Sequence, residues 1–341
     1  MWGREFWACL RQRSQQLLSK DLRKIEDLQV FEGVPLLPLT SFRIGGPAHL
    51  FLAPKTLKAL EKTIFYLSNR SISYKVIGQG SNLLISDKGV KLVMSLAALK
   101  RIQCSVESRF ESEDHRQISS SSFLQEERSA NGHRFKMVDV EAGCRLRSLI
   151  SWSVRNSLGG LENLSGIPAS VGGAIFMNAG TNKCFMAEVI DAVQFTGPDG
   201  SCWSHRDQLY FDYRAFRLQD NAIISAARIK FGKSNADQIR QHLRSAMCQR
   251  KATQPLGKPS AGCIFKNPPG VSAGKLIDQC GLKGFRVGDA EVSKRHANFI
   301  INRGKASAVE VMDLLEIIKE RVKKETDVEL VPEVSFWGME T

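Results

Sequence analysis

The sequence lacks the features that mark membrane-spanning, fibrous and zinc-binding proteins. Its longest nearly unbroken hydrophobic run, residues 92–99, is about half of the roughly 18–20 residues that a membrane-spanning helix needs. None of its 8 cysteines form a C-x-x-C pair, which argues against zinc ribbons and thioredoxin-like redox motifs. No internal repeat is visible. We therefore expect no membrane insertion, no metal site, and free thiols in a reducing cytoplasm.

The N-terminus also lacks the pattern of a secretory signal. Arg11 and Arg13 follow Cys9 before any apolar core of useful length. The segment is somewhat rich in Arg and Ser, so an organellar transit peptide is an alternative, which Glu5 and Asp21 oppose. We expect residues 1–32 to be a basic helical extension that carries no chemistry.

What the chain does have is the composition of a globular protein with excess positive charge. Of its 341 residues, 43% are hydrophobic and 24% are charged, which excludes collagen, coiled coil and full-length disorder. Lys and Arg outnumber Asp and Glu by 48 to 35, which leaves a formal net charge of +13. A basic surface suits nucleic acid, an anionic membrane, or small polyanionic substrates such as nucleotides.

Strand and helix patterns alternate after residue 41. Thr56 is placed to cap a helix, and Ser307 with Glu310 forms a capping box at the start of another. Residues 103–134 are polar and short of apolar residues, which is typical of a surface insertion. The pattern of residue types changes again after Gly232, where we place a domain boundary. The expected helices cover residues 57–67, 146–154, 236–250 and 307–322, and the expected strands cover residues 50–53, 74–77, 83–85, 92–96, 137–140, 189–195, 222–231 and 298–301.

Two glycine-rich segments could bring backbone close to a ligand. Residues 78–82 read Gly-Gln-Gly-Ser-Asn after a strand, where free N–H groups suit a phosphate. This is neither a complete dinucleotide fingerprint nor a P-loop, and a plain β-turn explains it as well. Ser170 could cap a helix that contains the pair Gly172-Gly173. Because glycine inside a helix costs about 1 kcal/mol, the pair needs a reason, which is either a ligand pressed on the helix or close packing against a strand.

Single polar residues elsewhere are weak signals by themselves. Arg214 follows Tyr213 in a loop, where an arginine is usually solvated, and Glu333 could be a solvated carboxylate. Cys263 lies near Lys266, a cation that favours the thiolate, although most single cysteines are inert. His296 has no partner at metal-ligand or triad spacing, so we take it as structural.

Together, however, these segments resemble the MurB family of UDP-N-acetylenolpyruvoylglucosamine reductases, which act in peptidoglycan synthesis. The resemblance runs from about residue 33 to 338, apart from the insertion, with its motifs in the family's order. It rests on residues 40–48, 78–84, 166–181, 213–214, 262–268, 276–284 and 332–334.

The resemblance implies an α+β fold, with a two-subdomain FAD-binding region of the p-cresol-methylhydroxylase and vanillyl-alcohol-oxidase type and a C-terminal substrate domain. The domains would cover residues 33–231 and 232–341. The chain would be a cytoplasmic monomer that serves cell-wall biogenesis, cell shape, the cell cycle and cell division. The implied FAD-binding residues are Gly78, Gln79, Gly80, Ser81, Asn82 and Leu83 around the pyrophosphate, and Gly166, Ile167, Pro168, Gly172 and Gly173 along the flavin.

The implied reaction passes a hydride from NADPH through FAD to the enolpyruvyl ether of UDP-N-acetylglucosamine, which yields UDP-N-acetylmuramate. Arg214 would hold the substrate carboxylate and stabilise charge that spreads onto it, Cys263 would donate a proton, and Glu333 would assist near the developing enol. Asn267 would contact the substrate, and Lys251 would meet a phosphate or a carboxylate.

Three positions depart from the family pattern. Cys263 stands where most relatives have serine, and a thiol can also donate a proton. Phe216 replaces the serine of Tyr-Arg-x-Ser, which puts the hydrogen bonds around Arg214 in question. Ser335 stands where some members have arginine.

Two other functions remain open at this point. A flavin oxidase for another substrate would not need the loop around Cys263 or the Pro332-Glu333 element. A nucleic-acid-binding protein would need its charge gathered with aromatic residues on one face, yet only the segment around Trp2, Phe6 and Trp7 comes close. A flavin absorption spectrum would exclude the second alternative.

Overall fold

The N-terminal strands form the first sheet of the computed structural model, which describes residues 16–104, 127–128, 134–181, 184–218 and 222–339. The sheet has the order β1-β2-β5-β3, with β1 antiparallel to β2 and the other pairs parallel. Helix α2 and the short strand β4 lie between these strands in the sequence. Thr56 caps α2, as predicted, by accepting a hydrogen bond from the Ala59 N–H. The bounds are β1 Leu28–Pro35, β2 Pro47–Pro54, α2 Leu57–Ser68, β3 Lys75–Ile77, β4 Leu83–Ile85 and β5 Val90–Ser95.

The start of this region differs from the expected extension. Residues 16–22 are helical, and Leu22 is fully buried in the core that α2 shares with the sheet. Strand β1 begins at Leu28 and pairs with β2 along its length. The last residues of the 1–32 segment therefore belong to the sheet, because Leu28 and Val30 alternate into the core. Residues 1–15 lie outside the described part of the chain.

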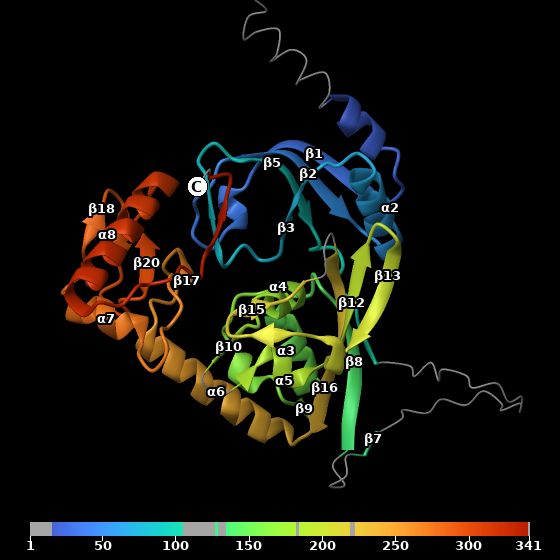
Figure 1. Cartoon of the computed structure of the whole chain (residues 1–341). Coiled ribbons are helices and arrows are strands. Elements are labelled where there is room, and N and C mark those ends of the chain that lie inside the picture. Colours follow the sequence, from blue (N-terminus) through green and yellow to red (C-terminus); the bar gives the residue numbers. More distant parts are fainter. Residues whose placement is uncertain (1–15, 105–126, 129–133, 182–183, 219–221, 340–341) are drawn as a thin grey trace, which may run out of the picture.

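The second sheet is antiparallel and has the order β13-β12-β16-β8-β6. Most of the predicted insertion, residues 105–126 and 129–133, lies outside the described residues. Helices α3 and α4 pack with this sheet, in a core continuous with that of α2 (Figure 1). The bounds are β6 Ile102–Cys104, β7 Glu127–Arg128, β8 Arg134–Glu141, α3 Leu146–Arg155, β9 Leu158–Gly159, α4 Val171–Phe176, β10 Gly180–Thr181, β11 Cys184–Phe185, α5 Met186–Val189, β12 Ile190–Gly197, β13 Gly200–His205, β14 Phe211–Asp212, β15 Ala215–Phe216 and β16 Ile223–Lys233.

The long helix α6 leads from the second sheet to a third, whose order is β17-β20-β19-β18 (Figure 1). Helices α7 and α8 share a core with this sheet, and that core also takes in Phe42, Ile44 and Leu84 from the N-terminal region. The bounds are α6 Ala236–Thr253, β17 Ser260–Cys263, α7 Ala273–Gln279, β18 Arg286–Val287, β19 Ala290–Val292, β20 Phe299–Asn302, α8 Ala308–Thr326 and β21 Ser335–Trp337, with 3-10 turns at Leu37–Leu39, Glu162–Leu164 and Arg206–Gln208.

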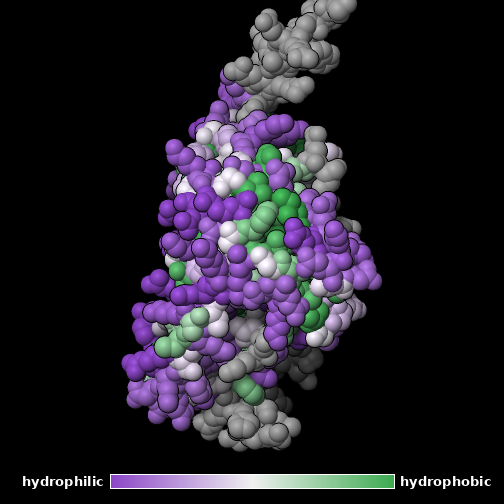
Figure 2. Space-filling model, turned by 90° about the vertical axis from the view of Figure 1, so that its left-hand side faces the viewer, coloured by the Kyte–Doolittle hydropathy of each residue, from purple (hydrophilic) through white to green (hydrophobic). Residues whose placement is uncertain are grey.

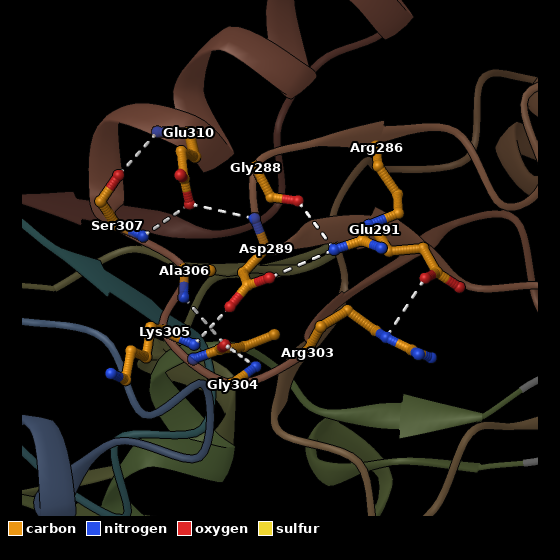
Figure 3. A network of polar contacts seen from close by, with 11 residues as sticks. Arg286, Gly288, Asp289, Glu291, Arg303, Gly304, Lys305, Ala306, Ser307 and Glu310 are labelled. Atoms are coloured by element: carbon orange, nitrogen blue, oxygen red, sulfur yellow. Dashed lines mark hydrogen bonds and ion pairs between the residues drawn. The ribbon is translucent and has the colours of Figure 1, made fainter.

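The first turn of α8 is fixed by a polar network (Figure 3). Ser307 and Glu310 form the predicted capping box, in which the Ser307 Oγ accepts from the Glu310 N–H and the Glu310 Oε2 accepts from the Ser307 N–H. The same carboxylate accepts from the Asp289 N–H, and Asp289 in turn accepts from the Lys305 N–H. The cap thus also holds the turn between β18 and β19.

The C-terminal part also contacts the first region directly. Asp87, in the turn between β4 and β5, accepts a hydrogen bond from the Ala308 N–H, and the buried Asn302 donates to the carbonyls of Phe42 and Arg43. Strand β21 then pairs in parallel with β4, and Trp337 packs with Leu36, Ala48, Ile77, Ile85, Val90 and Val93. The chain therefore returns to complete the region where it began.

The surface in Figure 2 is mainly hydrophilic, and its hydrophobic residues gather in a patch on the upper half of that face. Among the described residues, no helix combines the length and hydrophobicity that a membrane crossing requires.

Candidate active site

A cleft of about 1980 Å³ lies where the three sheets meet, and it is lined by segments from all of them. The predicted FAD-binding residues, Gly78 to Leu83, Gly166 to Pro168, Gly172 and Gly173, are all among its lining residues. So are four of the five predicted catalytic and substrate-binding residues: Arg214, Cys263, Asn267 and Glu333. The structure therefore brings together segments that are far apart in the sequence.

The loop after β3 is held from both sides of the cleft. The Gly80 carbonyl accepts from the Ser41 N–H, and the Asn82 side chain donates to the Glu333 carbonyl at 3.0 Å. Gly80 has a φ of 59°, and a Cβ there would collide with the Leu39 carbonyl. Glycine is therefore required at this position on two independent grounds, conformation and space.

The second glycine segment combines both explanations that the sequence left open. Ser170 caps α4 by accepting from the Gly173 N–H at 3.2 Å. A Cβ on Gly172 would lie 2.8 Å from the Cβ of Ala142, so this glycine allows close packing of the helix against the end of β8. Gly172 and Gly173 also line the cleft, where their backbone is available to a flat group.

Arg214 is not the solvated loop residue that an isolated arginine would be. It occupies the turn of the hairpin formed by β14 and β15, with a φ of 56°. Its Nε lies 3.1 Å from the Glu333 Oε1, and its Nη1 donates to the Gly180 carbonyl at 3.1 Å. The Nε–H is buried and poorly aligned with the carboxylate, so it has no hydrogen-bond partner within the described residues. A ligand oxygen could supply that acceptor.

Cys263 and Glu333 are neighbours because their backbones pair. The Glu333 N–H donates to the Ile264 carbonyl at 2.7 Å, and the Lys266 N–H donates to the Val331 carbonyl. Both side chains are partly buried in the cleft wall. Their position at one end of the cleft, with Arg214 beside them, follows from this short antiparallel contact.

The titration of these groups differs from what the sequence suggested for Cys263. Burial, followed by the Glu333 carboxylate, raises the pKa of the Cys263 thiol to about 12, although Arg214 and Arg250 act in the opposite direction. The expectation that the cation of Lys266 favours a thiolate is therefore wrong, because desolvation outweighs the nearby positive charges. Burial also raises the pKa of Glu333, against the effects of Arg214 and Lys266.

Arg250, one residue before the predicted Lys251, is a residue of the cleft that was not expected from the sequence. Arg250 lines the cleft, whereas Lys251 is exposed and is not among the lining residues. Burial lowers the pKa of the Arg250 guanidinium. Helical periodicity is the signal that points to Arg250, because the cleft-lining residues of α6 recur at helical spacing: His242, Ser245, Ala246, Gln249, Arg250 and Thr253.

Two further polar residues line the same end of the cleft. The Asn267 Oδ1 accepts from the Ala273 N–H at 3.0 Å, so the side-chain oxygen is engaged at the start of α7. The second is His296, a structural residue by the expectation from its spacing, which also lines the cleft. Its Nδ1 accepts from the Asn298 N–H, and burial lowers its pKa. No group of three or more His, Cys, Asp or Glu residues suited to a metal ion is found in the part of the chain that the structure describes.

Comparisons with known proteins agree with this arrangement. Residues 254–337 match the model described as "UDP-N-acetylenolpyruvoylglucosamine reductase, C-terminal domain", and residues 131–205 match an FAD binding domain. The reductase of that name from Syntrophotalea carbinolica is 36% identical, with 94% of this chain and 99% of that protein covered. The one from Moorella thermoacetica is 33% identical, with 94% and 97% covered. The crystal structure of the Thermus caldophilus reductase matches with a TM-score of 0.69 at 34% identity, covering 91% of this chain and 98% of that one.

Proposed function

Because the chain belongs to the UDP-N-acetylenolpyruvoylglucosamine reductase family, a group of FAD-containing oxidoreductases of peptidoglycan synthesis, we propose that it reduces the enolpyruvyl ether of UDP-N-acetylglucosamine to UDP-N-acetylmuramate at the expense of NADPH. The single observation that carries this proposal is the meeting of Arg214, Cys263 and Glu333 at one end of a glycine-lined cleft. The remaining steps assign what each side chain does there.

The cleft fits FAD because glycine-rich backbone lines it at residues 78–83, 166–168 and 172–173. Cβ atoms at Gly80 and Gly172 would collide with the Leu39 carbonyl and with Ala142, so glycine lets these lining segments lie close against their protein neighbours. Gly78, Gln79, Gly80, Ser81, Asn82 and Leu83 would hold the pyrophosphate through backbone N–H groups, and Gly166, Ile167, Pro168, Gly172 and Gly173 would border the flavin. FAD, when bound, supplies the hydride that NADPH provides and the enolpyruvyl group receives.

The polar side chains that line the cleft act on the substrate. Arg214 has a buried Nε–H for which the described part of the chain offers no aligned acceptor, and it holds the carboxylate of the enolpyruvyl group while negative charge spreads onto it. Arg250, a second partly buried cation on the cleft wall, binds an anionic group of the substrate. Asn267 keeps its amide N–H groups for the substrate while its oxygen is engaged.

Cys263 donates the proton that completes the reduction at C2. Its raised pKa keeps the thiol protonated at neutral pH, which is the state that a proton donor requires. The Glu333 carboxyl group lies beside the Arg214 guanidinium. It assists near the developing enol through its effect on the local charge.

The division of the chain follows from this assignment. We propose an FAD-binding region up to about residue 231 and a substrate-binding region from 232, with β21 returning to the first. The FAD-binding match at residues 131–205 and the C-terminal match at residues 254–337 fall within these two parts and support the division. We further propose that the enzyme acts as a cytoplasmic monomer.

Separating the two half-reactions tests the proposal. Arg214→Lys keeps the charge but loses the planar two-pronged contact with a carboxylate. The variant should keep the yellow flavin spectrum, and its visible absorbance should bleach with NADPH at nearly the normal rate. Return of the absorbance after addition of the UDP-linked enolpyruvyl ether should slow about 10- to 100-fold, the range expected for a lost charge-assisted bond. Equal slowing of both half-reactions would contradict the assigned role, and a protein without flavin would contradict the proposal as a whole.

A further inference from the structure

Asn178 occupies a strained and buried position just beyond α4. Its φ is 39°, in the left-handed region, and only 6% of the residue is exposed. The side-chain Oδ1 accepts from the Ala187 N–H at 3.1 Å, and the Nδ2 donates to the Asp212 carbonyl at 2.9 Å. Both ends of the amide are thus engaged, with partners in two different elements.

The second partner connects Asn178 to Arg214. Asp212 is the last residue of β14, directly before the turn that contains Tyr213 and Arg214. The Asp212 carboxylate accepts from the Tyr213 N–H at 2.6 Å. Two hydrogen bonds therefore hold the start of the turn, one to the Asp212 side chain and one from Asn178 to the Asp212 carbonyl. Two residues after Asn178, the Gly180 carbonyl accepts from the Arg214 Nη1. The segment 178–180 therefore holds both the backbone and the guanidinium of the hairpin.

The other strand of the hairpin, β15, pairs with β14 along the backbone, and its buried side chain is held by apolar contacts. Phe216, which replaces a serine of the family pattern, is buried and packs against Phe211 and Phe195, with ring centroids 4.7 and 6.1 Å away. Ring contacts of this kind tolerate small rotations, whereas a hydrogen bond at the turn specifies its direction. The direction of the Arg214 guanidinium matters here, because its Nε–H lies beside the Glu333 carboxylate but is not aligned for a hydrogen bond to it.

We propose that Asn178 is a positioning residue for Arg214, which sets the hairpin so that the guanidinium points at the substrate carboxylate. The inference rests on the proposed role of Arg214. Asn178 itself touches no reacting atom in this scheme and acts only through the Asp212 carbonyl. Its loss should therefore affect the step that uses Arg214 and spare the step that does not.

Asn178→Asp tests this with the smallest change. Aspartate tolerates the left-handed conformation and still accepts from Ala187, but it cannot donate to Asp212. Flavin content and bleaching by NADPH should stay near those of the wild type, while the melting temperature should fall, because a buried carboxylate then faces the Asp212 carbonyl. The return of flavin absorbance with the enolpyruvyl substrate should slow about tenfold, the worth of one directing hydrogen bond. In an Arg214→Lys background the same change should add less than a twofold effect, because coupled residues are not additive.

Two further variants make the result unambiguous. Asn156→Asp alters an exposed asparagine that donates to the Trp152 carbonyl away from the cleft, and both half-reactions should proceed as in the wild type. Asn178→Gly removes both bonds without new charge and permits the same φ, so it should reproduce the split between the half-reactions.

The outcomes separate the inference from the proposed function. If Arg214→Lys slows substrate reduction but Asn178→Asp and Asn178→Gly do not, the inference is wrong and the role of Arg214 stands. Slowing of both half-reactions by the Asn178 variants, full additivity with Arg214→Lys, or loss of flavin from both variants would show a merely structural residue. Normal substrate reduction by Arg214→Lys would overturn the role of Arg214 and the inference together.

Discussion

The two walls of the cleft are built by different means. The wall after β3 and along α4 exposes backbone, with glycines where side chains would collide, and its shape depends on turns and caps. The rest of the lining presents charged or titratable side chains, Arg214, Arg250, Cys263 and Glu333, whose properties depend on burial and on one another. A cofactor that stays bound needs a fixed surface, whereas a substrate that reacts needs groups that stabilise changing charge. The following changes test this contrast.

The largest effect is expected at Cys263. Cys263→Ala should keep FAD and its bleaching by NADPH, but substrate reduction should fall by about 10²- to 10⁴-fold, the usual contribution of a positioned acid. Cys263→Ser should remain active, since a hydroxyl in the same place can deliver a proton. Rapid-mixing absorbance measurements compare the two steps, with the exposed Cys202→Ala as the control. A fully competent alanine variant would remove Cys263 from the mechanism.

A change on the backbone wall should act on the cofactor instead. Gly80→Ala forces a side chain toward the Leu39 carbonyl in a left-handed conformation, and strain of about 1–3 kcal/mol should weaken FAD binding by up to roughly 100-fold. Flavin retained after gel filtration measures this. Gly33→Ala is the matched control, because Gly33 has a φ of 64° but open space around it. If both variants retained flavin equally, steric fit at Gly80 would be unimportant.

Arg250 should show a smaller effect that is confined to substrate affinity. Arg250→Gln removes a partly buried cation of the cleft wall, so the KM for the UDP-linked substrate should rise about tenfold with little change in flavin content. Lys251→Gln, next to it but outside the cleft lining, should change KM less. Steady-state kinetics decide between the two, and the reverse ranking would restore the prediction made from the sequence.

The smallest effect concerns alkaline pH. A donor whose pKa is raised to about 12 stays protonated as the pH rises, so the substrate half-reaction should change less than about twofold between pH 7 and 9 on account of this group. The same shift makes the stability of the fold depend on pH. The free energy of unfolding keeps its full value below the unfolded thiol pKa of about 8.5, and it falls as the pH rises from there toward 12. Iodoacetamide at pH 8 should accordingly modify the exposed Cys202 and Cys248 well before Cys263. A loss of activity with an apparent pKa near 8.5, absent in Cys263→Ser, would contradict the raised pKa.

Local signals explain why much of the fold and of the backbone wall could be predicted. The caps at Thr56, Ser170 and Ser307 depend on a few consecutive residues, and each is confirmed. The turn at residues 78–82 is likewise a local feature, and its glycines could be recognised from the sequence alone. Elements of this kind need no knowledge of distant contacts.

The catalytic wall could be predicted only in part, because its properties arise from contacts between distant segments. The resemblance to a family supplied Arg214, Cys263 and Glu333, but not the ion pair between Arg214 and Glu333 or the burial that raises the pKa of Cys263. Motif spacing selected Lys251, whereas the face of α6 selects Arg250. Asn178 lies within the matched segment 166–181, but its hydrogen bond to the Asp212 carbonyl, in another strand, could not be predicted from the sequence.

The return of β21 to β4 has a consequence for the order of events during synthesis on the ribosome. Trp337 fills a core whose other members, from Leu36 to Val93, are made long before it. Until the last strand emerges, β4 has an open edge, and the side chains that Trp337 will cover stay exposed to water and to chaperones. The glycine-rich loop of residues 78–82 is tied to the same late segment through Asn82 and Ser335. Flavin uptake should therefore follow the emergence of β21, and a nascent chain stalled before residue 335 should not acquire flavin.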